Sequence, residues 1–332
     1  MAISLDEAKV GMADHVDQMV VDEFQRSSLL LDKLTFDNAI SPGTGGSTLT
    51  YGYIQLLSPS TAAIRAIGNE YTAGEAKRVE KTARAVIMGG SFKVDRVLQN
   101  TSGAIDELAF QAKQKIKATA NYFHNLVVNG TKESTGAGYV TGTFDGIHKL
   151  IAGTANEFTS AVDVSTSALM DTNANAFIDE LDGLCAAVEG GADMLLMNKK
   201  MLMKVRSCAR RAGYYERTKD DFGRVVEMFN GVPLMDMGGY YTGSTTNDVV
   251  ATSAATASLP GKSTIYAVAL GLDAFHGISP TGNSVISSYM PDMTKPGAVK
   301  EGEVELVAGV VLKNTLKAAA LKDIGITPKT GG

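Results

Sequence analysis

The sequence is poor in the residues from which binding and catalytic sites are most often built. Its 332 residues include no tryptophan, 2 cysteines and 4 histidines. Cys185 and Cys208 do not form a C-x-x-C pair, so neither a zinc ribbon nor a disulfide framework is available. No histidine lies three or four positions from another histidine or a cysteine, which is the spacing of a helical metal site. We therefore expect no metal and no cofactor.

Signals for membranes, secretion and common enzyme chemistry are missing as well. No run of about 18 apolar residues is present, so the sequence predicts no membrane span. The N-terminus is acidic where a secretory signal would be basic. Gly261-Lys262-Ser263 resembles the end of a phosphate-binding loop, but Thr256 and Ala257 stand where the upstream glycine should be. We expect a plain loop there and a protein that is not an enzyme.

The net charge of −5 is concentrated at the N-terminus. Residues 1–23 carry six acidic residues and one lysine, and removing them from the totals of 36 and 31 leaves 30 acidic and 30 basic residues. The body therefore has no electrostatic footprint for nucleic acid. A predicted helix from Lys199 to Arg211 is basic, but acidic residues follow closely. A solvated or subunit-contact surface is favoured there over a nucleic-acid site.

The first distinctive feature is a long stretch of predicted β structure at residues 48–98. We predict a two-stranded ribbon in this stretch, with a tip at residues 72–82 that has little to bury. An isolated ribbon of this kind has almost no core in water, so it needs a partner, most simply another copy of the chain. The charged residues expected at or beside the tip, and expected to contact a neighbouring subunit, are Glu75, Lys77, Arg78, Glu80, Lys81 and Arg84.

The second feature is a long amphipathic helix predicted at residues 102–129. Ser102 is a suitable N-cap and Asn129-Gly130 is a suitable stop. A helix of this length spans roughly 40 Å, so its apolar face needs a covering layer along its whole length. The residues expected on that buried face are Ile105, Leu108, Ala112, Ile116 and Phe123.

The remainder alternates between helices and strands. Met194–Met197 is predicted as a buried strand, Asn198 as the cap of the next helix, and Asn230-Gly231 as a two-residue hairpin turn. Residues 240–261 are rich in Ser, Thr, Ala and Gly, which predicts a flexible insertion. Residues 304–322 are predicted to return as strand structure beside the long helix. Residues 165–280 would then be an inserted domain.

The order of these parts resembles the major capsid protein of tailed bacteriophages, the Hong Kong 97-type capsid fold. The resemblance is carried by IRAIGNEYTAGEAKRVEKTARAVIMGGSFKVDRVL at 64–98, NYFHNLVVNGT at 121–131, FDGIHKLI at 144–151, GVPLMDMGGYY at 231–241 and VAGVVLKNTLKAAALKDI at 307–324. It implies an α+β fold with an N-terminal arm, an extended β-ribbon loop, a long spine helix in a peripheral domain and an inserted axial α/β domain. The implied divisions are 1–47 for the arm, 48–98 for the extended loop, 99–164 for the peripheral domain, 165–280 for the axial domain and 281–332 for the return and tail.

The resemblance also implies a function. A major capsid protein assembles into pentamers and hexamers that form an icosahedral shell around the phage genome, inside the host bacterial cytoplasm and then in the virion. Expected partners are other copies of the chain, a separate scaffolding protein, portal and decoration proteins, and packaged DNA contacted at most non-specifically. Some members of the family crosslink a ribbon lysine, and nothing here selects one among Lys77, Lys81 and Lys93. Two alternatives remain: the shell of an encapsulin-type compartment, and an unrelated α/β enzyme.

Overall fold

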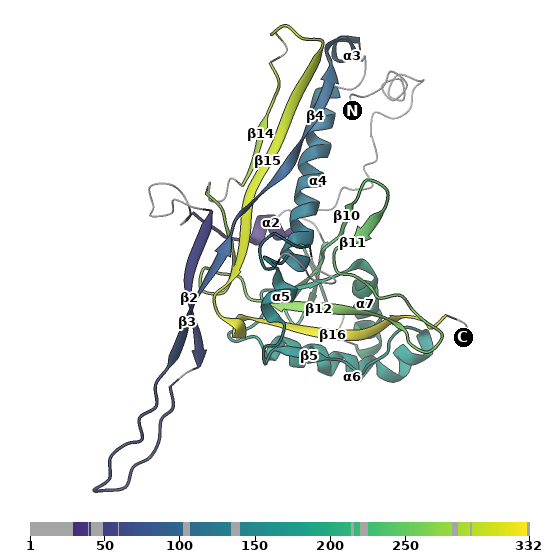
Figure 1. Cartoon of the computed structure of the whole chain (residues 1–332). Helices are drawn as coiled ribbons and strands as arrows, with labels where there is room; N and C mark the ends of the chain where they lie inside the picture. Colours follow the sequence, from purple (N-terminus) through teal and green to yellow (C-terminus); the bar gives the residue numbers. More distant parts are fainter. Residues whose placement is uncertain are drawn as a thin grey trace.

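The structure, a computed structural model, consists of an upright part, a rounded part and a ribbon that projects away from both (Figure 1). The upright part is built around one long helix, and the rounded part is built on a seven-stranded sheet. Helices and strands are mixed throughout, as the sequence predicted. The residues that the structure describes are 29–38, 40, 49–58, 60–101, 107–133, 140–213, 216–219, 225–280, 285–292 and 294–330.

The upright part packs one helix against a five-stranded sheet. Its elements are α2 (Leu29–Lys33), β1 (Phe36–Asp37), β4 (Val86–Asp95), α3 (Arg96–Thr101), α4 (Glu107–Asn129), β13 (Phe275–Ile278), β14 (Ile286–Tyr289) and β15 (Val299–Leu312). β15 is central: β4 pairs with one edge over ten residues, and β14 and β13 follow each other along the opposite edge. β1 then pairs parallel with β13, and α4 lies against β4 and β15. The long helix therefore has the covering layer that its apolar face requires.

The long helix ends where the sequence predicted. A Cβ added to Gly130 would lie 2.5 Å from the Phe144 carbonyl oxygen and 2.6 Å from that of Leu126, so only glycine fits directly after Asn129. The expected start cannot be compared in the same way. Residues 102–106, which include the predicted core residue Ile105, lie outside the described residues.

The rounded part has three layers. Its elements are α5 (Ile147–Ile151), β5 (Glu157–Thr159), α6 (Ser167–Ala186), β6 (Met194–Met197), α7 (Lys199–Ala212), β7 (Glu216–Lys219), β8 (Val225–Phe229), β9 (Val232–Asp236), β12 (Gly261–Val268) and β16 (Ala318–Thr327), with the sheet order β5-β16-β12-β6-β9-β8-β7. Successive strand residues point to opposite faces. Leu195 and Met197 accordingly pack with α6 and α7, whereas Met194 and Leu196 join the cluster that contains α4 and α5.

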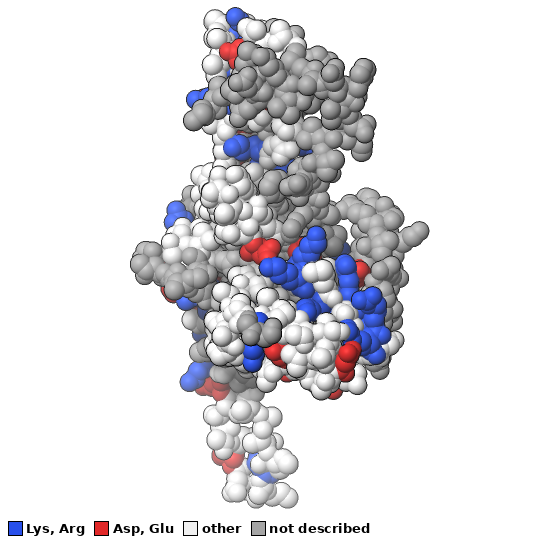
Figure 2. All heavy atoms as spheres, turned by 90° about the vertical axis from the view of Figure 1, so that its right-hand side faces the viewer, with Lys and Arg blue, Asp and Glu red and all other residues white. Residues whose placement is uncertain are grey.

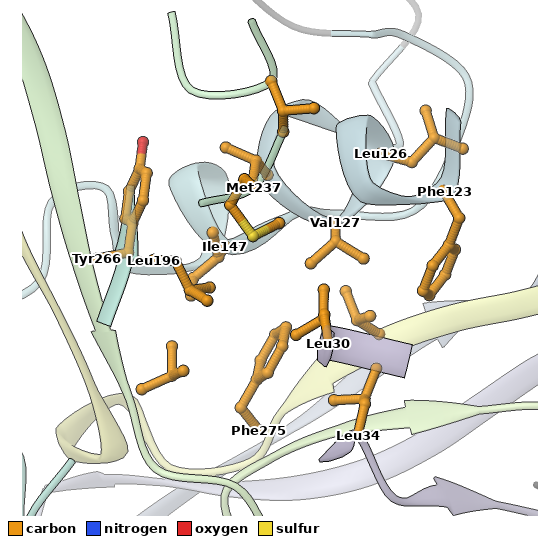
Figure 3. Close-up of a cluster of buried hydrophobic side chains, with 14 of the residues drawn as sticks. Leu30, Leu34, Phe123, Leu126, Val127, Ile147, Leu196, Met237, Tyr266 and Phe275 are labelled. Carbon is orange, nitrogen blue, oxygen red and sulfur yellow. The ribbon is translucent and has the colours of Figure 1, made fainter. Parts of the chain in front are cut away.

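One hydrophobic cluster joins the upright and rounded parts (Figure 3). Phe123 and Val127 enter it from α4, and Phe275 enters from β13. Leu196 and Tyr266 enter it from the seven-stranded sheet. Phe123 is fully buried, with its ring 6.3 Å from that of Phe36 and 6.2 Å from that of Phe144. The two parts therefore share a core and cannot separate without exposing it.

Several local expectations for the rounded part are confirmed. The strand at Met194–Met197 and the following helix are present, and Asn198 caps that helix by accepting a hydrogen bond from the Met201 backbone amide at 2.8 Å. Asn230 and Gly231 have φ values of 48° and 78° and join β8 to β9. Both are left-handed, as the predicted two-residue turn requires.

Two other expectations are wrong. Of residues 304–322, the part in β15 lies along the long helix, but β16 pairs with β12 in the rounded part. Because β16 is buried on both faces along most of its length, its sequence pattern did not reveal which sheet it joins. The stretch predicted as a flexible insertion contains the hairpin of β10 (Gly239–Tyr241) and β11 (Thr246–Asp248), and it then buries Val249 and Val250.

The ribbon is shorter than predicted. β2 (Thr50–Ser58) pairs antiparallel with β3 (Lys77–Arg84), but the chain then leaves the ribbon at Ala85, and β4 pairs with β15 instead. The alternating buried residues Phe92 and Val94 face α4, which explains why this segment joins the upright sheet.

We predict that Phe123→Ala lowers the free energy of unfolding by about 3–5 kcal/mol, because it leaves a cavity in the cluster that joins the two parts. Tyr122→Ala is the matched control, since Tyr122 is the aromatic residue directly before Phe123 on α4 and is 40% exposed. It should cost less than about 1 kcal/mol. Urea unfolding followed by circular dichroism measures both, and equal losses would contradict the assignment of the buried face.

Candidate assembly surfaces

The far half of the ribbon is uncovered. The chain reverses at Ile67-Gly68, where Gly68 has a φ of 92°, and every residue from 60 to 82 is exposed. Ile64 and Ile67 have relative exposures of 102% and 104%, and Tyr71 is 65% exposed. Exposed isoleucines on a projecting segment are costly in water, so this segment is a candidate contact surface for another molecule.

The charged residues predicted at the tip lie elsewhere on the ribbon. Five of them belong to β3, and Glu75 precedes that strand. The tip had been placed at residues 72–82, whereas the turn is at residues 67–68. The isoleucines at the true tip were missed, although the dipeptide Gly68-Asn69 is a turn signal that marks it. The residues in β3 are Lys77, Arg78, Glu80, Lys81 and Arg84.

One face of the paired strands is open along its length. Ile54 and Leu56 on β2 lie opposite Glu80 and Arg78 on β3, and all four side chains are exposed. Neither Glu80 nor Arg78 has an ion-pair partner among the described residues. This face therefore combines apolar and charged groups that are available to a partner.

The root of the ribbon, in contrast, is held to the body. Tyr53 is buried in a small cluster with Ile278 and Val311, and burial raises the pKa of its phenol. The Tyr51 hydroxyl donates to Asp37 at 3.2 Å, and the Gln55 side-chain amide donates to the Leu312 carbonyl oxygen at 3.4 Å. The ribbon is thus anchored at one end and free at the other.

The helix residues that were predicted to form a core lie at different depths. Phe123 and Ala112 are buried, whereas Leu108 and Ile116 are half-buried and pack on a cluster that contains Phe92. The helix therefore rests on the upright sheet along its upper length and enters the main core only near its end.

The upright sheet presents its other face to solvent. Glu301 and Glu303 of β15 point away from α4, and Lys93 of β4 lies 3.5 Å from Glu301. Ile87 on the same face of β4 is 60% exposed. Farther along the same face of β15, the ribbon root covers Val307 and Val311. The exposed stretch that carries Glu301 and Glu303 is a second candidate contact surface.

The basic helix α7 provides a third candidate contact surface. Figure 2 shows lysine and arginine side chains gathered on the face that carries α7. Arg206 pairs with Glu227, Arg211 pairs with Asp171, and Lys200 lies 4.0 Å from Asp248. Half of the cations of this helix are therefore matched by carboxylates within the chain, which fits the predicted solvated or subunit-contact surface.

The structure assembles no catalytic constellation from the described residues. Lys262 lies in strand β12, 3.9 Å from Asp323, rather than in a loop that opens a helix. Burial raises the pKa of both Cys185 and Cys208 to about 11 and lowers that of His124 to about 4, so all three groups are neutral near pH 7. In the described part of the chain no group of three metal-ligating side chains occurs, and no helix is long and apolar enough to cross a membrane.

No protein-family model and no curated protein matches the sequence. Solved structures do match its fold. The holo-SrpI encapsulin complex from Synechococcus elongatus PCC 7942 has a TM-score of 0.60 at 14% identity, over 100% of this chain and 99% of that chain. A chain from Mycobacterium phage Bobi has a TM-score of 0.56 at 13% identity, over 98% and 100%. The capsid of a native GTA particle has a TM-score of 0.55 at 13% identity, over 98% and 100%.

These likenesses extend over nearly the whole chain, although identity is low. The chain therefore has the Hong Kong 97-type capsid fold that the order of its parts predicted.

We predict that the far half of the ribbon contributes little to folding. Replacing residues 59–76 by Asn-Gly joins Ser58 to Lys77, which are paired in the structure, through a turn that suits a hairpin. The melting temperature of the unassembled chain should stay the same or rise slightly, because residues 60–76 are all exposed and a shorter loop costs less entropy. A loss of more than about 2 kcal/mol in urea unfolding would show that these residues help to hold the monomer together.

Proposed function

We propose that the protein assembles with copies of itself into a closed shell, as a major capsid protein of a tailed bacteriophage. The main support for this proposal is the uneven burial of the ribbon. Its root packs on the body, whereas Ile64 and Ile67 at its tip are wholly exposed. Burying one such side chain is worth about 1.5–3 kcal/mol. A ribbon tip that meets a different surface on the next copy makes a head-to-tail contact, and such contacts close into rings.

The expected roles of the other parts belong to the same proposal. Residues 1–47 act as the arm, 48–98 as the extended loop, 99–164 and 281–332 as the peripheral domain with its tail, and 165–280 as the axial domain. Because β16 pairs with β12, residues 318–327 are better assigned to the axial domain. Pentamers and hexamers of these subunits would form the virion shell, assembled in the host cytoplasm with a separate scaffold, a portal and decoration proteins.

An encapsulin-type compartment is the second candidate. It is favoured by the match to an encapsulin at a TM-score of 0.60, with nearly complete coverage of both chains. The acidic N-terminal segment and the stretch at residues 240–261, rich in Ser and Thr, are the features that favour the phage. Either protein acts as a structural component and needs no active site.

The contents of particles isolated from their natural source separate the two candidates. A capsid is expected to yield particles that contain nuclease-protected DNA, and an encapsulin particles that contain a co-purifying protein cargo. Absorbance at 260 and 280 nm and mass spectrometry of the purified particles measure this directly. Particles with cargo protein and no DNA would replace the phage assignment by the encapsulin one.

The charges on β3 are expected to matter for assembly and not for folding. Reversing Lys77, Arg78 and Lys81 to Glu should leave monomer melting unchanged, since all three are exposed. One exposed ion pair is worth only about 0–1 kcal/mol, but a shell repeats each contact many times. Shell formation should therefore be blocked, or become sensitive to salt, in sedimentation velocity and negative-stain microscopy.

Two further variants complete this experiment. The exchange Lys77→Arg, Arg78→Lys and Lys81→Arg keeps every charge and should assemble as the wild type does. Ile64→Ser with Ile67→Ser removes the apolar tip and should weaken assembly without the salt dependence. If the charge-reversed and serine variants both form normal shells at low salt, the ribbon does not hold neighbouring subunits together.

A further inference from the structure

Among the described histidines, His276 is the one that lies beneath the ribbon root, beside Tyr51. Phe275 points into the main core, and side chains alternate along β13, so His276 points to the opposite face. Ile278, which shares that face, packs with Tyr53 of the ribbon and with Val311. The His276 ring lies 6.1 Å from the Tyr51 ring, edge to face, and is fully buried. The ribbon root is therefore part of what separates this imidazole from solvent.

The hydrogen bonding of His276 is incomplete. Its Nδ1 lies 3.4 Å from the Ala274 carbonyl oxygen, which fits a neutral ring that carries its proton on Nδ1. Its Nε2 is buried and has no hydrogen-bond partner among the described residues. Buried polar atoms are nearly always paired, so this nitrogen marks a site that tolerates the neutral ring. The backbone of Gly271 also acts on the ring and favours its charged form, but burial outweighs it.

The groups around the ring act in both directions, and burial has the largest effect. Lys313, which follows β15, lies 5.4 Å above the Tyr51 ring and disfavours a second cation nearby. Among the described residues, Asp37 of β1 is the carboxylate that favours the charged ring, and it also accepts a hydrogen bond from the Tyr51 hydroxyl. β2 supplies the Tyr51 phenol itself, and β3 supplies Ala83, which is uncharged. Burial and Lys313 together lower the pKa of His276.

We propose that His276 makes the docking of the ribbon root sensitive to acid. The root stays docked on the body while the imidazole is neutral, and it undocks when a proton from solvent binds Nε2. The charged ring is disfavoured while it is buried, and water can solvate it only after β2 and β3 have lifted. Lifting also breaks the hydrogen bond from Tyr51 to Asp37, so this bond is lost in the same step in which His276 is exposed. The device belongs to the single chain and does not depend on shell formation.

The sign of the pH effect follows from the two states. In the lifted state His276 is exposed and titrates near its ordinary pKa of about 6.5, whereas in the docked state its pKa is lower. The docked state thus keeps its full stability above about pH 6.5 and loses it as the pH falls below that value. At pH 5 the opening equilibrium can rise by up to about 30-fold, since each pH unit below the ordinary pKa contributes a factor of ten.

Hydrogen exchange of the full, unassembled chain tests this proposal between pH 7.5 and pH 5, with rates corrected for the intrinsic effect of pH. Protection of residues 50–58 should fall by up to about 30-fold, while β12 keeps its protection. In His276→Phe a phenyl ring replaces the imidazole and cannot titrate, so the protection of residues 50–58 should not change with pH. His276→Gln is a second non-titrating variant in case the first folds poorly.

The matched control is His148→Gln, because His148 also has a pKa lowered by burial but bonds to Tyr266, in the main core. This variant should retain the acid response of the root. The proposal is overturned if wild-type protection of residues 50–58 does not change, if both His276 variants loosen in acid as the wild type does, or if all strands lose protection together. None of these outcomes bears on whether the chain forms shells, which the ribbon variants test separately.

Discussion

The contact on which the rest of the structure depends is the burial of the lower end of α4 between two sheets. Phe123 and Val127 of this helix share one cluster with Phe275 of the upright sheet and Tyr266 of the seven-stranded sheet. Each sheet presents alternate residues to that cluster, so neither could lose the helix without exposing an apolar face. This shared core makes a single body of two parts that lie in discontinuous stretches of the chain. A projecting element can act on a neighbour only if the body that carries it is firm.

The ribbon is buried at its root and exposed along its far half, so only its root is held by this firm body. At its root, Tyr53 and Gln55 are buried and tied to the body, while residues 60–82 are all exposed. A monomer gains no stability from the exposed half, and two fully exposed isoleucines carry a cost in solubility. Such a segment is consistent with a chain whose final state contains other copies of itself. The exposed stretch of the upright sheet around Glu301 and the basic face of α7 are also uncovered surfaces on elements that are firmly held by the body.

The sequence predicted local features well and long-range pairing poorly. Asn198 and the Asn230-Gly231 turn were recognised because capping and turn geometry depend on a few adjacent residues. The end of the long helix was recognised for the same reason. The partners of β4 and β16 were not, since the strand pattern records which face is buried but not against which strand. The position of the ribbon tip was missed because charge was taken as the sign of exposure, whereas Ile64 and Ile67 beside the turn are fully exposed.

The same limit explains why His276 carried no signal in the sequence. It stands alone, without a second histidine or cysteine at ligand spacing, and sequence reasoning could only leave it aside. Its significance arises from β1, β2 and β15, whose residues lie far apart in the chain and meet around one buried ring. An unpaired nitrogen there lowers the stability of the docked root slightly at every pH, and a fully apolar side chain would avoid that cost. A titratable group buried beneath the ribbon root is therefore placed where its protonation can act on the docking of that root.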